Sequence, residues 1–210
     1  MAESNNSLVA LKHHLATSGV NGTSLALRKE SLAKTKEENI LLLDISGSMA
    51  DVLQSGQRRV DILWNLVQQM RGKNIPFRIC IFNESTEWCE PTECPQPYSS
   101  TNLGGALQFL ANNCSGLHQV TLITDGLPDN PDYALSEAQK LGCPINVLYV
   151  GPDDQEYNSL YAKAFCANLA LASQGKYASN SLNSEILQLT ANNDLRLMLT
   201  EGQGKGQINL

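Results

Sequence analysis

Three short segments of this chain carry oxygen-bearing side chains of the kind that hold hard cations. Asp44, Ser46 and Ser48 alternate directly after the apolar run at 40–43. Thr101 precedes a glycine pair, and Asp125 follows a second apolar run. Carboxylate and hydroxyl oxygens suit Mg²⁺, Mn²⁺ and Ca²⁺. The residue types therefore predict a divalent-cation site, if the fold brings the three segments together.

The elements that must position these side chains alternate along the chain. Continuous apolar runs are typical of strands covered on both faces, and helices are indicated by apolar positions on one face. Strands are predicted at 39–45, 76–82, 119–125, 144–150 and 175–178, with a hairpin-like piece at 86–89. Helices are predicted at 60–71, 101–113, 132–141, 156–173 and 182–200. This order predicts an α/β fold of three layers, a doubly wound, mostly parallel, Rossmann-like sheet with helices on both faces.

The predicted sheet also explains how distant segments could meet. Open parallel sheets bind ligands in the crevice outside the carboxyl ends of their strands. The Asp44 segment follows the first predicted strand, and Asp125 ends the third. Thr101 is expected on a loop that enters a helix. We therefore expect all three segments at one edge of the sheet.

With these residues in place, the chain resembles the von Willebrand factor A family, also called integrin I-domain-like. The metal-ion-dependent adhesion site of that family uses an Asp-x-Ser-x-Ser run, a distant Thr and a distant Asp. This chain supplies those types in the same order, as Asp44, Ser46, Ser48, Thr101 and Asp125. The resemblance implies that the three hydroxyls contact the cation, while the two carboxylates act largely through waters and hydrogen bonds. It covers roughly residues 38–200.

The resemblance also implies a function. A cation held mainly by neutral hydroxyls keeps much of its positive charge and has an unfilled position, so it would bind a Glu or Asp of a partner protein. Magnesium is the expected ion, with manganese or calcium as alternatives. Small intracellular members of the family often work with ring-forming ATPases, so an AAA+ ATPase or another complex subunit is an expected partner. The expected function is a non-catalytic protein-interaction module.

Length and composition limit the other possibilities. A chain of 210 residues favours one domain with extensions: an N-terminal extension at 1–37, the domain at 38–200 and a glycine-rich tail at 201–210. Ser7 to Leu15 could form an amphipathic helix within the extension. The net charge of −6 and pI near 5.0 argue against nucleic acid and anionic membranes as partners. No membrane span or secretory signal is recognisable, and a cytoplasmic location is expected.

Three other interpretations remain open. A strand-end Asp44 is also typical of magnesium-dependent phosphohydrolases, although Ser46 stands where such an enzyme needs a second acid. The cation could instead serve a scaffold, binding only for local rigidity. Cys89 and Cys94 bracket a loop that could close a disulfide or offer two ligands to zinc, but no second close Cys or His pair follows. Reduced thiols are the favoured interpretation for the six cysteines.

Overall fold

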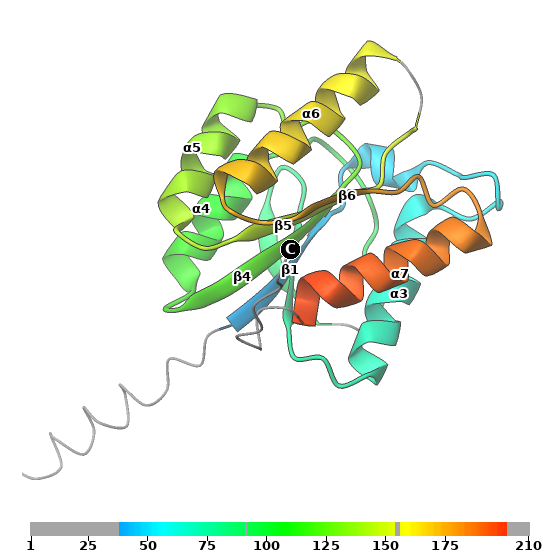
Figure 1. Ribbon diagram of the computed structural model, residues 1–210, viewed down its shortest axis with the longest axis horizontal. Coiled ribbons are helices and arrows are strands. Elements are labelled where there is room, and N and C mark those ends of the chain that lie inside the picture. Colours follow the sequence, from blue (N-terminus) through cyan, green and yellow to red (C-terminus); the bar gives the residue numbers. More distant parts are fainter. Residues whose placement is uncertain (1–37, 91, 154–155, 201–210) are drawn as a thin grey trace, which may run out of the picture. The chain divides into compact units, whose positions relative to one another are not determined.

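The computed structural model describes residues 38–200, except for 91 and 154–155. In this part of the chain, six strands form one sheet in the order β3-β2-β1-β4-β5-β6, with helices on both faces (Figure 1). The strands are β1 (Glu38–Asp44), β2 (Arg78–Phe82), β3 (Thr86–Cys89), β4 (Leu117–Thr124), β5 (Ile145–Tyr149) and β6 (Tyr177–Ser179). Only β3 runs antiparallel to its neighbour. The predicted fold class is confirmed.

Helices connect the strands and cover both faces. They are the 3₁₀ turn η1 (Gly47–Ala50), α3 (Arg59–Gly72), α4 (Leu103–Asn113), α5 (Pro131–Leu141), α6 (Tyr157–Ala172) and α7 (Glu185–Thr200). Helices α4, α5 and α6 cover one face of the sheet, and α3 and α7 cover the other (Figure 1). The buried side chains of each group form a separate core with the face that they cover. Along β1, Ile40 and Leu42 belong to the first core, and Leu41 and Leu43 belong to the second. This alternation explains why the run has no polar position.

Local signals fix the ends of the helices near the sheet edge that was predicted to bind a ligand. The Asn102 side chain accepts a hydrogen bond from Gly105 N and caps α4, and Asn130 caps α5 in the same way through Tyr133 N. Gly104 allows these two helices to approach closely, because a Cβ there would lie 2.2 Å from the Tyr133 ring. The first turns of α4 and α5 therefore pack together beside the candidate site.

The C-terminal end of α7 is held by a buried group of amide side chains on three adjacent strands. Gln119 Nε2 on β4 donates to Met198 O at 2.7 Å, and Asn146 Nδ2 on β5 donates to the same carbonyl at 3.2 Å and to Gln119 Oε1 at 3.1 Å. Asn39 Nδ2 on β1 donates to Leu199 O at 3.5 Å. Carbonyls of a last helical turn have no partner within their own helix. The sheet supplies those partners here.

The two tryptophans lie in different cores. Trp64, on α3, is 7% exposed and belongs to the core shared with α7. Trp88, on β3, packs against the other core and contacts Phe109 of α4. The guanidinium of Arg78 lies 3.7 Å from the centroid of the Trp88 ring, a cation–π arrangement. Each face of the sheet therefore contains one indole ring.

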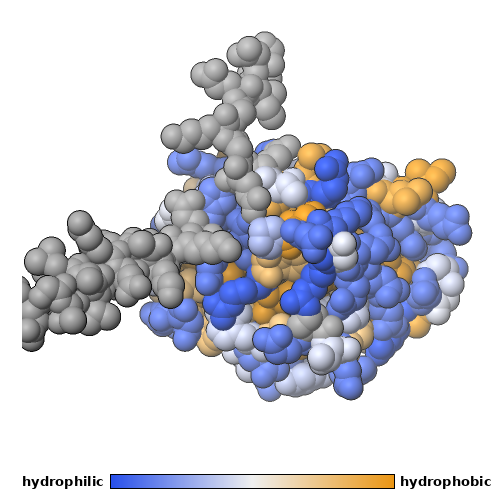
Figure 2. Space-filling view, turned by 90° about the horizontal axis from the view of Figure 1, so that it is seen from below, coloured by the Kyte–Doolittle hydropathy of each residue, from blue (hydrophilic) through white to orange (hydrophobic). Residues whose placement is uncertain are grey.

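One face of the described part of the chain is mainly polar. Seen from below the view of Figure 1, it is mostly hydrophilic, with apolar side chains in small groups (Figure 2). The exposed apolar side chains include Ile186 and Leu189 on α7 and Leu171 on α6. No helix of the described residues is long and apolar enough to cross a membrane.

The elements expected between 38 and 200 all occur, and their bounds differ by a few residues. The largest difference is at α7, which was expected from 182 and begins at Glu185. Leu182 has a left-handed backbone with φ of 58°, and the Asn180 side chain accepts its N–H, so the helix cannot start there. The turn η1 was not expected. The predicted helix at 7–15 and the tail at 201–210 lie outside the described residues, and the domain bounds stay a prediction.

Candidate metal centre

The candidate site lies where the order of the strands reverses. Strand β1 lies in the middle of the sheet, β2 and β3 follow on one side of it, and the chain then crosses to β4 on the other side. Doubly wound sheets bind ligands in the crevice at such a switch point. Asp44 ends β1, and Asp125 follows the end of β4, so the two carboxylates lie at this switch point. The strand order thus brings the first and last predicted ligands together.

Asp44 is fully buried and is held by neutral donors. Its Oδ1 accepts a hydrogen bond from Ser46 N at 2.8 Å, and its Oδ2 accepts one from Thr124 Oγ1 at 2.6 Å. Burial raises the pKa of Asp44 to about 7, and the nearby negative charge of Asp125 adds to this effect. Asp44 therefore organises the turn that follows β1, and its charge there is only partly compensated.

The hydroxyls of Ser46 and Ser48 lie side by side and lead to Asp125. The two Oγ atoms are 3.3 Å apart, and Ser48 Oγ donates to Asp125 Oδ1 at 2.8 Å. A hydroxyl that gives its proton to a carboxylate keeps its lone pairs for another partner. The two hydroxyls therefore keep oxygen lone pairs beside the Asp125 carboxylate.

Thr101 reaches the site on a loop that is tied to both other segments. Ser99 O accepts the N–H of Gly47, and Tyr98 N donates to Ile45 O. Thr101 itself accepts a hydrogen bond from Asp129 N at 2.9 Å through its carbonyl, in the loop after Asp125. The backbone thus joins all three predicted segments. That the Thr101 hydroxyl is a ligand stays a prediction, as does cation binding by the five residues.

Arg59 is a charged component that the sequence analysis did not identify. It opens α3, is 3% exposed, and donates from Nη1 to Ser48 O at 2.8 Å and to Asp125 Oδ2. Burial raises the pKa of Asp125, and Arg59 opposes that shift. The sequence contains a signal for this residue, because position 59 falls on the same face of the helix as the buried Leu63, Leu66 and Met70. A cation on an apolar stripe indicates a buried partner of opposite charge.

Gly151 fixes the backbone behind Asp125. A Cβ at this position would lie 2.2 Å from Asp125 O and 2.3 Å from the hydroxyl oxygen of Tyr149. Tyr149 is fully buried, and its hydroxyl has no hydrogen-bond partner in the described structure. The loop after β5 can pack under the site only because residue 151 has no side chain.

The donor set fits a hard cation and suits softer ions less well. Two hydroxyls and two carboxylates supply only oxygen. Among the described residues, no group of three His, Cys, Asp or Glu side chains is placed to hold a metal ion. A cation at the crevice would thus depend on the serine hydroxyls as well as on the acids. Asp44 and Asp125 are two buried negative charges that face one buried positive charge, Arg59, so a further cation is electrostatically favoured.

Comparisons with known proteins bear on the fold. No family model matches the sequence, and no curated protein matches it. Among solved structures, a von Willebrand factor type A protein from Catenulispora acidiphila superposes with a TM-score of 0.59 at 16% identity, over 81% of this chain and 43% of that one. The chain has a von Willebrand factor A-like fold.

Two further structures share this fold. The PilB minor pilin from Streptococcus sanguinis gives a TM-score of 0.57 at 16% identity, over 80% of this chain and 63% of the pilin. An aerotolerance-related membrane protein from Bacteroides fragilis gives 0.51 at 19% identity, over 77% of this chain and 100% of that chain. This chain therefore spans less than two thirds of the pilin and of the Catenulispora protein. At these identities the likeness concerns the A-type fold alone.

Cys89 and Cys94 were the alternative metal ligands. Cys89 Sγ donates to Glu90 O at 3.5 Å, whereas Cys94 Sγ donates to Asp61 at 3.6 Å. Burial raises the pKa of both thiols, to about 11 for Cys94, which disfavours the thiolate that zinc requires. All six cysteines are unpaired.

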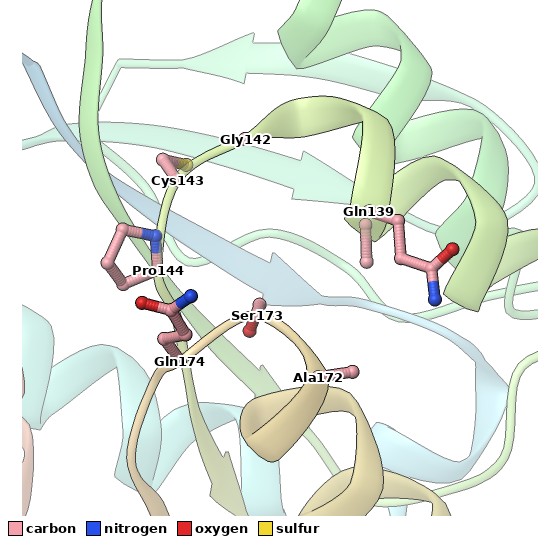
Figure 3. A pocket seen from close by; sticks show the side chains of 8 residues that line it. Gln139, Gly142, Cys143, Pro144, Ala172, Ser173 and Gln174 are labelled. Atoms are coloured by element: carbon pink, nitrogen blue, oxygen red, sulfur yellow. The ribbon is translucent and has the colours of Figure 1, made fainter.

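A small pocket of about 200 Å³ lies away from the candidate metal centre. It lies beside the start of β5, between the chain after α5 and the chain after α6 (Figure 3). Gly142, Cys143 and Pro144 line one side, and Ser173 and Gln174 line the other. Ser173 Oγ already bonds to Leu169 O and Ile145 N, so its polar atoms serve the backbone. The pocket does not add to the candidate metal centre.

Proposed function

We propose that this A-type domain is a non-catalytic protein-interaction module. A divalent cation, most simply Mg²⁺, would be held by Ser46, Ser48 and Thr101, with Asp44 and Asp125 acting through hydrogen bonds. When bound, the ion supplies a positive charge with an open position for a Glu or Asp side chain of a partner protein. The partner would be a subunit of an intracellular complex, and an AAA+ ATPase subunit is one candidate.

The observation that carries this proposal is the link between the two serines and Asp125. Ser46 Oγ and Ser48 Oγ lie 3.3 Å apart, and the Ser48 proton is directed to Asp125. Helix capping is the other common use of Asp and Ser in such a run. Here Ser46 precedes η1 but makes no side-chain capping bond. The Ser46 hydroxyl therefore does not serve as a helix cap, which supports a ligand role.

The position of Asp44 argues against the phosphohydrolase alternative. A nucleophilic carboxylate must reach its substrate with a free oxygen. Both oxygens of Asp44 accept hydrogen bonds, and the residue is fully buried. Ser46 also replaces the second acid that such an enzyme needs. A structural role for Asp44 accounts for its surroundings better than a catalytic one.

The experiment is an affinity purification of the full chain from its own cells, with Mg²⁺ or with a chelator. We expect an acidic partner to be captured only with Mg²⁺. In calorimetry, Ser48→Ala or Thr101→Ala should weaken Mg²⁺ binding about tenfold or more, because the loss of a residue that surrounds a metal ion lowers its affinity by at least that factor. Ser55→Ala and Ser100→Ala are matched controls, since both side chains are exposed in the same two loops.

Three results would contradict the proposal. Capture that survives both the chelator and the two variants favours a scaffold with a structural metal. Loss of far-ultraviolet circular dichroism on chelation means that the cation holds the fold and does not serve as a bridge. Phosphatase turnover that disappears in Asp44→Asn favours the enzyme. The cytoplasmic location remains part of the proposal, and the unpaired cysteines support a reducing compartment.

A further inference from the structure

Arg59 is built into the candidate metal centre. Its backbone N–H donates to Asp51 O at 2.9 Å, which fixes the start of α3 against the loop after β1. Its guanidinium contacts both Ser48 O and the Asp125 carboxylate, and so joins two of the three segments that form the site. The side chain is 4% exposed, and the carboxylate that it meets is 2% exposed. Solvent therefore hardly screens this pair.

Arg59 is also the only buried Lys or Arg among the described residues. Its charge cannot be lost near neutral pH, because a guanidinium keeps its proton in proteins. Asp51 approaches the guanidinium at 3.6 Å, but its side chain is 64% exposed and contributes a screened charge. With both carboxylates ionised, as the positive charge of a bound cation favours, the charged groups inside the site are Asp44, Asp125 and Arg59, and their sum is minus one.

We infer that Arg59 is a fixed counter-charge that sets the charge of the site to minus one, so that a bound divalent cation keeps a net positive charge and selects an anionic partner group. This inference rests on the proposed cation site. Without Arg59, the two carboxylates would neutralise a divalent ion completely. The ion would bind more tightly, and an external carboxylate would gain little by joining it. Arg59 would therefore weaken the binding of the cation and strengthen the binding of the partner's carboxylate.

A purely structural role predicts a different pattern. If Arg59 only crosslinks Ser48 and Asp125, then its removal disorders the site, and affinities for the cation and for a carboxylate fall together. The electrostatic role predicts that the two affinities move in opposite directions. Arg59→Lys separates the two roles further, because lysine keeps the charge and loses the planar fork of donors.

The test uses Mn²⁺ as the cation probe and acetate as the carboxylate probe, on the full chain. Electron paramagnetic resonance measures free Mn²⁺, and water-proton relaxation of the loaded protein follows the displacement of bound water by acetate. Acetamide, which has a similar shape and no charge, is the ligand control. Arg58→Gln is the matched protein control, because Arg58 is the adjacent arginine but is 33% exposed and paired with Asp61.

We expect Arg59→Gln to bind Mn²⁺ about tenfold more tightly and acetate at least about fivefold more weakly, from the removal of one poorly screened charge. Arg59→Lys and Arg58→Gln should stay within about threefold of the wild type on both measures. Acetamide should not bind to any variant.

The possible failures are distinguishable. A wild-type chain that does not bind Mn²⁺ contradicts the proposed function itself. A wild-type chain that binds Mn²⁺, with parallel losses of Mn²⁺ and acetate in both Arg59 variants, overturns the inference and leaves the cation site standing. If Arg59→Gln does not fold, Arg59→Lys decides alone: retained acetate binding supports the counter-charge, and its loss overturns it.

Discussion

The Asp44 side chain is a fully buried acid, and the hydrogen-bond donors that contact it are neutral. Ser46 N and Thr124 Oγ1 occupy its oxygens, and the neighbouring Asp125 carries the same charge. The pKa of Asp44 is therefore raised from 3.8 to about 7. Between those pH values the folded chain binds a proton that the unfolded chain does not bind, so the free energy of unfolding decreases as pH rises through this window.

This shift predicts the behaviour of Asp44→Asn in the absence of divalent cations. At pH 8 the variant should be more stable than the wild type by about 2–4 kcal/mol, because an amide carries no buried charge. The difference should shrink toward pH 5. Added Mg²⁺ should raise the stability of the wild type and leave that of Asp44→Asn nearly unchanged. Urea unfolding at pH 5 and pH 8, with and without chelator, measures all four cases. Equal stabilities at both pH values would contradict the charge argument.

The candidate ligands could be predicted from the sequence because their signal is local. Asp44, Ser46 and Ser48 lie within five residues of one another, and Asp125 ends a second apolar run. Arg59 and Thr124 were not predicted, because their contribution depends on contacts across the sheet. Thr124 looks like an ordinary strand residue, and only the register of β4 beside β1 places its hydroxyl on Asp44. Long-range pairing of this kind has no signature in a single sequence.

At the scale of the elements, α7 is held in place by hydrogen bonds from the strands as well as by its own apolar side chains. Gln119 and Asn146 are polar positions in two buried strands, and both donate to Met198 O. Amides in the sheet interior could not be predicted, because the acceptor is a helix end that lies 52 residues from Asn146 and 79 residues from Gln119. The strands and helices themselves were predictable from their periodicity, and their exact ends were set by caps such as Asn102.

We expect Gln119→Leu to destabilise the domain by about 2–4 kcal/mol, because Met198 O loses a donor and Asn146 loses an acceptor in the protein interior. The protection of α7 amides against hydrogen exchange should fall more than that of α4 amides. Gln108→Leu is the matched control, since Gln108 is exposed on α4, and it should change stability by less than about 0.5 kcal/mol. Uniform loss of protection in all helices would mean that the amides do not anchor α7 in particular.

At the scale of the whole molecule, the shared sheet makes the stability of each core depend on the packing of the other. Alternate residues of β1 enter opposite cores, so neither face can lose its packing without exposing the strand that serves the other. Trp64 reports on one core and Trp88 on the other. The overall order of elements was predictable, and so was the switch-point location of the site, because both follow from the alternation of strands and helices.

This arrangement predicts a single cooperative transition. In Trp64→Phe and Trp88→Phe, the remaining indole should lose its native fluorescence at the same urea concentration at which circular dichroism changes. Each variant serves as its own reference, so any destabilisation by the substitution cancels. Midpoints that differ between fluorescence and circular dichroism in either variant would mean that one face unfolds separately.

The packing of Gly151 limits how this chain can evolve. Every missense change at that codon adds at least a Cβ, which would collide with Asp125 O and the Tyr149 hydroxyl. The neighbouring Pro152 and Asp153 are exposed. Asp153 pairs with Lys163, but an ion pair with so exposed a carboxylate contributes little stability, so both positions can vary at little cost. In a library of point variants selected for partner capture, position 151 should therefore accept glycine alone, while positions 152 and 153 should accept many residue types. A loop that contains no predicted ligand would then be under the same selection as the predicted ligands themselves.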